Sequence, residues 1–145
     1  MSFFLPQGTY NALIQRSIDL RQLYRQAAST AEPGLRFVLN ENAQTLDVMI
    51  SDMQSQLRAS GGVPRKNGTL WASTRRYFGS MTKAIAPWDP VWIRELADKE
   101  TALLHAFEKL VKKLPPELAL TLRRQLPRLN SIHRDMDNLA GNDVR

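Results

Sequence analysis

The sequence predicts an all-α protein, a bundle of four helices within one domain. In four long stretches apolar residues recur every three to four positions, the spacing of an amphipathic helix. Gly and Pro clusters separate these stretches, and the alternating pattern of β-strands is weak throughout. The 145 residues are enough for a single domain, residues 1–145, with one sizeable core.

The first two helices are expected to form an antiparallel hairpin. The first spans about residues 9–29, with Thr9 as its N-cap, and Glu32-Pro33-Gly34 breaks the pattern after it. The second spans about residues 35–59 and ends at Gly61-Gly62, shortly before Pro64.

A long crossover, residues 61–90, follows this hairpin. Apolar residues in it share one helical face, which predicts a short extra helix from about Thr69: Leu70, Thr74, Tyr77, Phe78, Met81 and Ile85.

The last two helices are expected to form a second hairpin. The third spans about residues 90–113, with Asp89 as N-cap and Pro90 in the first position. After the break at Leu114-Pro115-Pro116, the fourth spans about residues 116–139, and Pro127 should bend it. Residues 1–8 are expected to form an N-terminal arm and residues 141–145 a frayed tail. Two hairpins joined by one long crossover have the connectivity of ferritin-like folds.

Composition narrows the class of protein. The hydrophobic fraction of 43% and the charged fraction of 23% are typical of soluble proteins, and no apolar run could span a membrane. The first residues lack the pattern of a secretory signal, and the chain contains no cysteine. A cytoplasmic protein without membrane insertion is therefore expected.

The formal net charge is +6, and part of it is concentrated. No acidic residue occurs between Asp52 and Asp89. That interval holds a basic edge: Arg58, Arg65, Lys66, Arg75, Arg76 and Lys83. A solvated surface is the favoured interpretation, and a phosphate-binding patch of a DNA-associated stress protein is the alternative.

One carboxylate interrupts the apolar face of the third helix. Glu100 lies on the same face as Leu96, Leu103 and Phe107, so it is expected in the core. A buried carboxylate needs a metal ion, a cation or a strong hydrogen-bond donor.

A di-iron centre needs a Glu from each of two helices and Glu-x-x-His from each of the other two. His133 is expected to face the core, but Asn130 stands three residues before it. Glu41 and Asp19 are expected to point away from the core. No cofactor is therefore expected, and the alternative is iron or another divalent metal held by Glu100 and His133.

A structural polar layer is the favoured interpretation of Glu100. Polar residues near the middle of the helices would share one layer of the bundle, and Arg21 or Gln125 would bind Glu100 directly. The expected layer comprises Ser17, Arg21, Asn42, Glu100 and Gln125.

The order of several short motifs resembles a bacterial ferritin-like family of unknown function. The motifs run along nearly the whole chain: Asn11-x-Leu13-Ile14, Asp19, Tyr24, Gly61-Gly62-x-Pro64, Gly68-Thr69-Leu70, Glu100, Phe107, Leu114-Pro115-Pro116, Arg124-Gln125 and His133. The resemblance implies the two-hairpin fold and no settled biochemical role. The chain departs from the family at Thr74-Arg75 and Tyr77, where a His-Arg pair and a Trp are usual, and at Ala97, where a Glu is usual.

These observations favour a non-catalytic structural or interaction protein with a degenerate metal site. The alternative is an iron-handling protein or metal-binding oxidoreductase. The apolar start Phe3-Phe4-Leu5 favours a homodimer, because such a patch tends to be covered. A protein partner is the other partner class considered, and nucleic acid is the less favoured one.

Overall fold

The computed structural model describes residues 7–67 and 90–138 of the chain. Within these ranges it contains four long helices and no strand: α1 (Gln7–Ala28), α2 (Pro33–Ala59), α4 (Pro90–Lys113) and α5 (Pro116–Asp137). The prediction of an all-α, four-helix bundle is confirmed. The expected short helix from Thr69, the apolar start of the arm and the tail lie outside the described residues.

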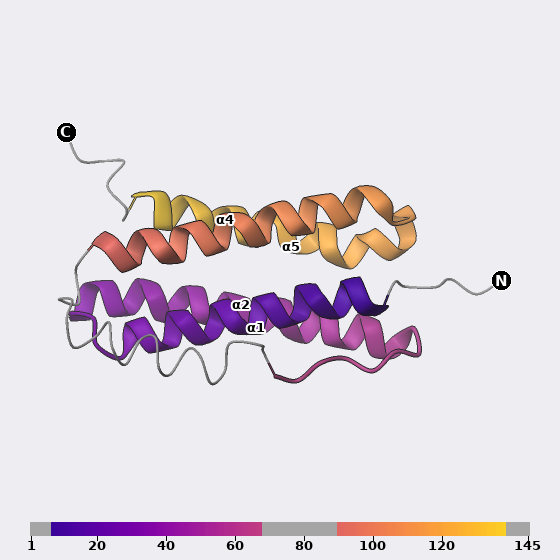
Figure 1. Cartoon of the computed structure of the whole chain (residues 1–145), viewed down its shortest axis with the longest axis horizontal. Coiled ribbons are helices and arrows are strands. Elements are labelled where there is room, and N and C mark those ends of the chain that lie inside the picture. Colours follow the sequence, from indigo (N-terminus) through magenta and orange to yellow (C-terminus); the bar gives the residue numbers. More distant parts are fainter. Residues whose placement is uncertain (1–6, 68–89, 139–145) are drawn as a thin grey trace.

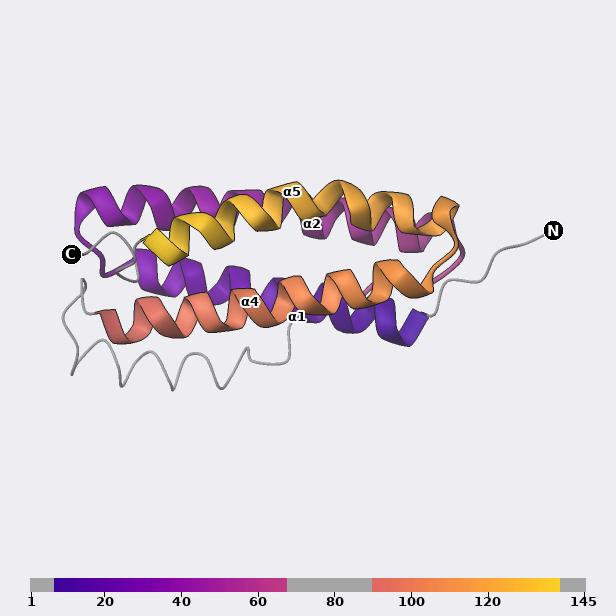
Figure 2. The same ribbon diagram turned by 90° about the horizontal axis from the view of Figure 1, so that it is seen from above.

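The four helices lie side by side as two antiparallel hairpins. α1 pairs with α2, and α4 pairs with α5. The hairpins stack so that α4 lies over α1 and α5 lies over α2 (Figures 1 and 2). α2 ends at the opposite end of the bundle from the start of α4 (Figure 1).

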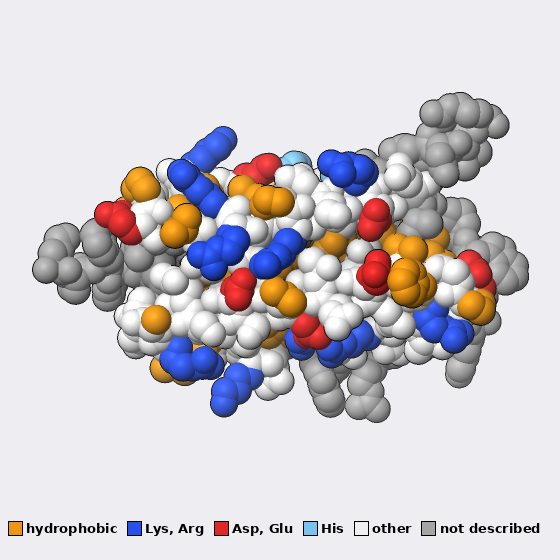
Figure 3. Space-filling view, turned by 180° about the vertical axis from the view of Figure 1, so that it is seen from behind, with side chains coloured by type: hydrophobic (Ala, Val, Ile, Leu, Met, Phe, Trp, Pro, Cys, Tyr) orange, Lys and Arg blue, Asp and Glu red, His pale blue; other side chains and the backbone are white. Residues whose placement is uncertain are grey.

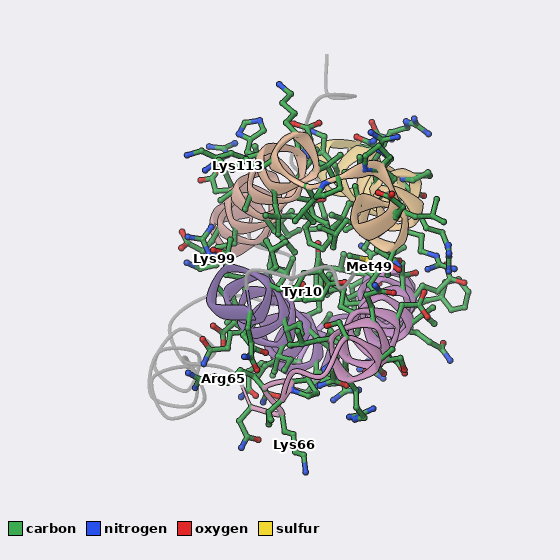
Figure 4. The ribbon with its side chains drawn as sticks, turned by 90° about the vertical axis from the view of Figure 1, so that its right-hand side faces the viewer. Tyr10, Met49, Arg65, Lys66, Lys99 and Lys113 are labelled. Carbon is green, nitrogen blue, oxygen red and sulfur yellow. The ribbon has the colours of Figure 1, made fainter. Side chains whose placement is uncertain are left out.

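A continuous apolar core fills the space between the helices. The view along the bundle shows Tyr10 and Met49 pointing into this space, whereas Lys99 and Lys113 lie outside it (Figure 4). The largest fully buried side chains come from three helices: Tyr10, Ile14, Leu23, Tyr24, Leu39, Leu46, Met49, Met53, Leu57 and Phe107.

The helix ends correct two predictions made from the sequence. α1 begins at Gln7, so Thr9 lies inside the helix and is not its N-cap. The Glu32-Pro33-Gly34 break is itself the start of α2, because the Glu32 carboxylate accepts hydrogen bonds from the backbone N–H groups of Gly34 and Leu35. α5 continues through Pro127 as one α-helix.

The segment after α2 is fastened to α1 by two amide side chains. Asn11 Nδ2 donates to the Val63 carbonyl at 3.0 Å, and Asn11 Oδ1 accepts from the Arg65 N–H at 2.8 Å. Gln7 Oε1 accepts from the Val63 N–H at 2.7 Å. Two motifs separated by about fifty residues in the sequence are therefore parts of one contact.

Gly61 and Gly62, just before this segment, are each required to be glycine, for two different steric reasons. Gly61 has φ +92°, a backbone conformation that side chains disfavour. Gly62 lies so close to Leu57 that an added Cβ would fall 2.6 Å from Leu57 Cδ1. Only glycine allows the chain to turn here at this distance from α2.

Candidate functional site

Each of the four helices contributes a polar side chain to one cluster between the helices, nearer the end of the bundle where α1 and α5 finish. We call these residues the central polar cluster: Tyr24 from α1, Asn42 from α2, Glu100 from α4 and His133 from α5. Tyr24 and Glu100 are fully buried and Asn42 is 3% exposed, whereas the His133 side chain is 30% exposed. The imidazole thus lies between the buried carboxylate and solvent.

Glu100 is bonded across the second hairpin. Its place among Leu96, Leu103 and Phe107 on α4 directs it inward, in agreement with the spacing of apolar residues. Glu100 Oε1 and His133 Nδ1 are 2.9 Å apart, and Thr101 Oγ1 lies 3.4 Å from the same nitrogen. A hydrogen bond to a partly exposed imidazole offsets part of the desolvation of the carboxylate.

This pairing corrects the expected partners of Glu100. Arg21 bonds to Asp47 on α2, with Arg21 Nη1 2.5 Å from Asp47 Oδ1, and its side chain is 21% exposed. Gln125 Nε2 donates to Asp52 Oδ2 at 3.1 Å and to the Thr121 carbonyl. Neither side chain binds Glu100.

The five residues of the expected polar layer accordingly have different partners. Ser17 is buried and donates to the carbonyl of Leu13 on its own helix at 2.8 Å. Asn42 and Glu100 belong to the central polar cluster, whereas Gln125 belongs to a hydrogen-bonded seam between α2 and α5. Arg21 belongs to the contact between α1 and α2.

The seam between α2 and α5 was not anticipated from the sequence. Arg128 Nη1 donates both to Asp52 Oδ2 at 3.1 Å and to Gln125 Oε1 at 2.6 Å. One turn away on α5, Thr121 Oγ1 donates to Gln56 Oε1 at 3.0 Å. Asp52 on α2 and Arg128 on α5 predict such a contact only when the two helices are already known to be neighbours.

The two described tyrosines are held in their neutral form. Burial raises the pKa of Tyr24 well above its usual value, and the negative charges of Glu100 and Asp135 add to the rise. The nearby Asn42 amide lowers the pKa of Tyr24 and so opposes this rise, although the amide and the hydroxyl group do not reach standard hydrogen-bond geometry. Burial, followed by the charge of Asp52, also raises the pKa of Tyr10.

One carboxylate was assigned to the wrong side of its helix. Asp19 was expected to point away from the core, but it is 8% exposed because it lies at the seam between α1 and α4. Glu41 is exposed, as expected, and lines a hollow of about 360 Å³ between α2 and α5 together with Asn42 and Asp135.

The described part of the basic edge lies at the end of α2 and just beyond it. Arg58, Arg65 and Lys66 are exposed, and Figure 4 shows Arg65 and Lys66 pointing away from the bundle. Arg75, Arg76 and Lys83 lie outside the described residues. The face formed by α2 and α5 carries acidic and basic side chains interspersed (Figure 3).

The donor set of the central polar cluster does not fit a di-iron centre. Such a centre requires carboxylates from all four helices, but α1 and α2 contribute Tyr24 and Asn42. Over residues 7–67 and 90–138, no three His, Asp or Glu side chains are grouped so that they could hold a metal ion. The same ranges contain no helix with both the length and the apolar character needed to cross a bilayer.

The fold and the cluster define an all-helical bundle with a carboxylate–histidine pair between its helices. Residues 9–113 match the domain of unknown function DUF2383, and the chain belongs to this family. The match includes Glu100 but stops before α5, so His133 and Gln125 lie beyond it. No curated protein and no solved structure matched the chain.

Proposed function

We propose that this protein is a ferritin-like bundle that acts in the cytoplasm as a non-catalytic interaction protein. The central polar cluster is, in this proposal, a degenerate metal site that now fixes the relative positions of the helices. One observation supports it most directly: Glu100 takes its hydrogen bond from His133, the other residue considered as a metal ligand. The remaining two helices offer an amide and a neutral phenol in place of carboxylates.

Metal analysis of the full chain, purified without chelator, tests the proposal. We expect well below one metal ion per chain, and equally little in Glu100→Gln. Two irons per chain, lost in Glu100→Gln but retained in Glu108→Gln, would overturn it. Glu108 is a suitable control because it lies on the same helix and is exposed.

The alternative is a metal-binding oxidoreductase or iron-handling protein. Its support is the position of Glu100 and His133, which present an oxygen and a nitrogen from facing helices within 2.9 Å of each other. Two side chains give little affinity, so this function requires further ligands. It predicts that added Fe²⁺ raises the midpoint of thermal unfolding of the wild type and not of Glu100→Gln.

A homodimer and a DNA-associated role remain separate proposals. Sedimentation of the full chain at several concentrations tests the dimer. For DNA, a basic edge that binds phosphates predicts an affinity that falls steeply with salt and is weakened by Arg65→Glu with Lys66→Glu.

A further inference from the structure

A groove runs along the seam between α1 and α4. Two adjoining hollows of about 540 and 250 Å³ share Arg16 and Ala102 in their walls. On α1 the lining residues run from Thr9 to Leu23, which is roughly 21 Å along a helix axis. We call this feature the α1–α4 groove.

Short side chains create the groove. Ala12 on α1 and Ala102 and Ala106 on α4 line it, and each has only a methyl group where larger side chains would fill the seam. Leu13 and Leu110, both 3% exposed, also line it from the core side. The floor is therefore apolar, and it lies between two helices that run antiparallel (Figures 1 and 2).

The rim of the groove is basic. The larger hollow is lined by Arg16, Lys109, Lys113 and His105, and no acidic residue lines it. The smaller hollow is lined by one acidic residue, Asp19, together with Arg16 and Lys99. Arg16, Lys109 and Lys113 are exposed, and none of them forms an ion pair with a described residue. Lys99 and Lys113 lie on the same side of α4 in Figure 4, because positions fourteen apart fall on nearly the same helical face.

The opposite face of the bundle lacks this arrangement. There the salt bridge of Asp52 with Arg128 neutralises charge across α2 and α5, and acidic and basic side chains are mixed (Figure 3). The unbalanced positive charge of the larger hollow is thus a local feature and does not merely reflect the net charge of the chain.

We propose that the α1–α4 groove binds an acidic amphipathic helix of a partner protein. A long, recessed apolar floor fits one face of a helix, with anchors at the i, i+3, i+4 and i+7 positions. Acidic residues on both flanks of that face would meet Arg16 on one side and Lys109 and Lys113 on the other. This inference rests on the proposed function, because it supplies the surface through which an interaction protein would act.

Charge argues against two occupants that this chain could itself provide. A second copy related by two-fold symmetry would bring one basic rim against another. The chain between Gly61 and Trp88 contains Arg65, Lys66, Arg75, Arg76 and Lys83 and no acidic residue, so it would also place positive charge on the rim. An acidic partner helix avoids both repulsions.

Fluorescence anisotropy with a designed probe tests the proposal. The probe is a labelled 18-residue helical peptide with Leu and Ala along one face and Glu on both flanks. The comparison peptide has Lys in place of every Glu. We expect the full chain to bind the acidic peptide and not the basic one.

Two groove variants and one control decide whether binding occurs at this place. Arg16→Glu with Lys109→Glu should weaken binding of the acidic peptide by at least about tenfold. Ala102→Trp fills the floor without changing charge and should also abolish binding. Lys66→Glu, at an exposed site away from the groove, should leave the affinity within about twofold. Circular dichroism of each variant verifies that the bundle is folded.

Several results would overturn the proposal. Absence of binding to the wild type, or equal weakening by Lys66→Glu, would show that the groove is not a specific site. A dimer that Ala102→Trp dissociates would assign the groove to a second copy. Displacement of the peptide by duplex DNA, with loss of DNA binding in the groove variants, would assign it to nucleic acid. Metal analysis of the same preparations tests the proposed function separately, since it does not depend on the groove.

Discussion

At the scale of single residues, Glu100 and His133 decide the chemistry of the central polar cluster. A carboxylate that is fully buried among leucines and a phenylalanine is costly unless a polar partner accompanies it. His133 supplies that partner from the neighbouring helix, with part of its ring in solvent. The pair therefore fixes how α4 and α5 align along their length.

Removing the imidazole should destabilise the protein. We expect His133→Phe to lower the free energy of unfolding by about 1–3 kcal/mol, because Glu100 loses this hydrogen bond while water can still reach part of the site. Adding Glu100→Gln to this variant should recover part of the loss, since the charge is gone. Urea unfolding of the two single variants and the double variant measures the coupling. His105→Phe is the control, because His105 is exposed on α4 and its replacement should change stability by less than about 0.5 kcal/mol.

Asn11 is a second residue whose side chain joins distant parts of the chain. Asn11→Ala removes both hydrogen bonds to the backbone of Val63 and Arg65. We expect a loss of about 1–3 kcal/mol in the free energy of unfolding, measured in urea. Asn40→Ala, at an exposed position of α2, should be nearly neutral. An equal effect of the two substitutions would show that the contact contributes nothing specific.

At the scale of elements, the end of α2 is shaped by its close approach to the turn that follows. The turn returns the chain along α2 so closely that Gly62 contacts Leu57, a core residue that is 1% exposed. The Asn11 contact then holds the outgoing segment against α1. The direction in which the chain leaves the first hairpin is thus fixed both by the steric contact at Gly62 and by the hydrogen bonds of Asn11.

Gly62→Ala should be destabilising, whereas Gly34→Ala should not. An added methyl group at position 62 would require Leu57 to move, at a cost of about 1–3 kcal/mol. At position 34 it meets only Glu32 oxygen atoms at 3.6 and 3.7 Å, which is ordinary contact in the first turn of α2. There we expect no loss, or a gain of up to about 1 kcal/mol. Thermal unfolding of both variants provides the comparison, and a stable Gly62→Ala would refute the steric argument.

At the scale of the whole molecule, the apolar core contributes more to stability than the ion pairs around it. Arg21 and Arg25 both bond to Asp47, and Arg128 bonds to Asp52, but these side chains are between 21% and 48% exposed. Ion pairs that are this exposed to solvent contribute little to the free energy of unfolding. The four apolar helix faces, buried against one another, are the main source of stability.

The buried tyrosines make the whole fold sensitive to alkali. Because the pKa values of Tyr10 and Tyr24 are raised in the folded state, the folded protein disfavours tyrosinate more than the unfolded chain does. The neutral buried tyrosines therefore contribute fully to the free energy of unfolding below about pH 10. Above about pH 10 this contribution falls by about 1.4 kcal/mol per pH unit for each tyrosine, because only the unfolded chain releases the proton.

Tyrosinate absorbance and helicity, followed together in a Tyr77→Phe background, measure this effect. We expect tyrosine ionisation to coincide with loss of helix, and Tyr24→Phe to move the transition to higher pH. Reversible ionisation near pH 10 with the helices intact would contradict the burial of these hydroxyl groups.

The sequence by itself determined the helices and their inward faces. Apolar spacing placed Glu100 in the core, and Pro90 and the Leu114-Pro115-Pro116 break located both ends of α4. It did not assign the starts of α1 and α2 correctly, and at α2 the reason is that capping by Glu32 depends on a side chain that folds back on the helix start. The local pattern of apolar residues predicts burial well, because burial depends on which face of the helix a residue occupies.

Only the tertiary structure decided which polar groups meet. Periodicity shows that Glu100, Arg21 and Gln125 lie toward the interior or its edge, but not which helix lies opposite each of them or at what height. Packing paired Glu100 with His133, Arg21 with Asp47 and Gln125 with Asp52, and it covered Asp19 at the seam of α1 and α4. The physical reason is that hydrophobic burial is non-directional, whereas hydrogen bonds depend on the relative positions of whole helices.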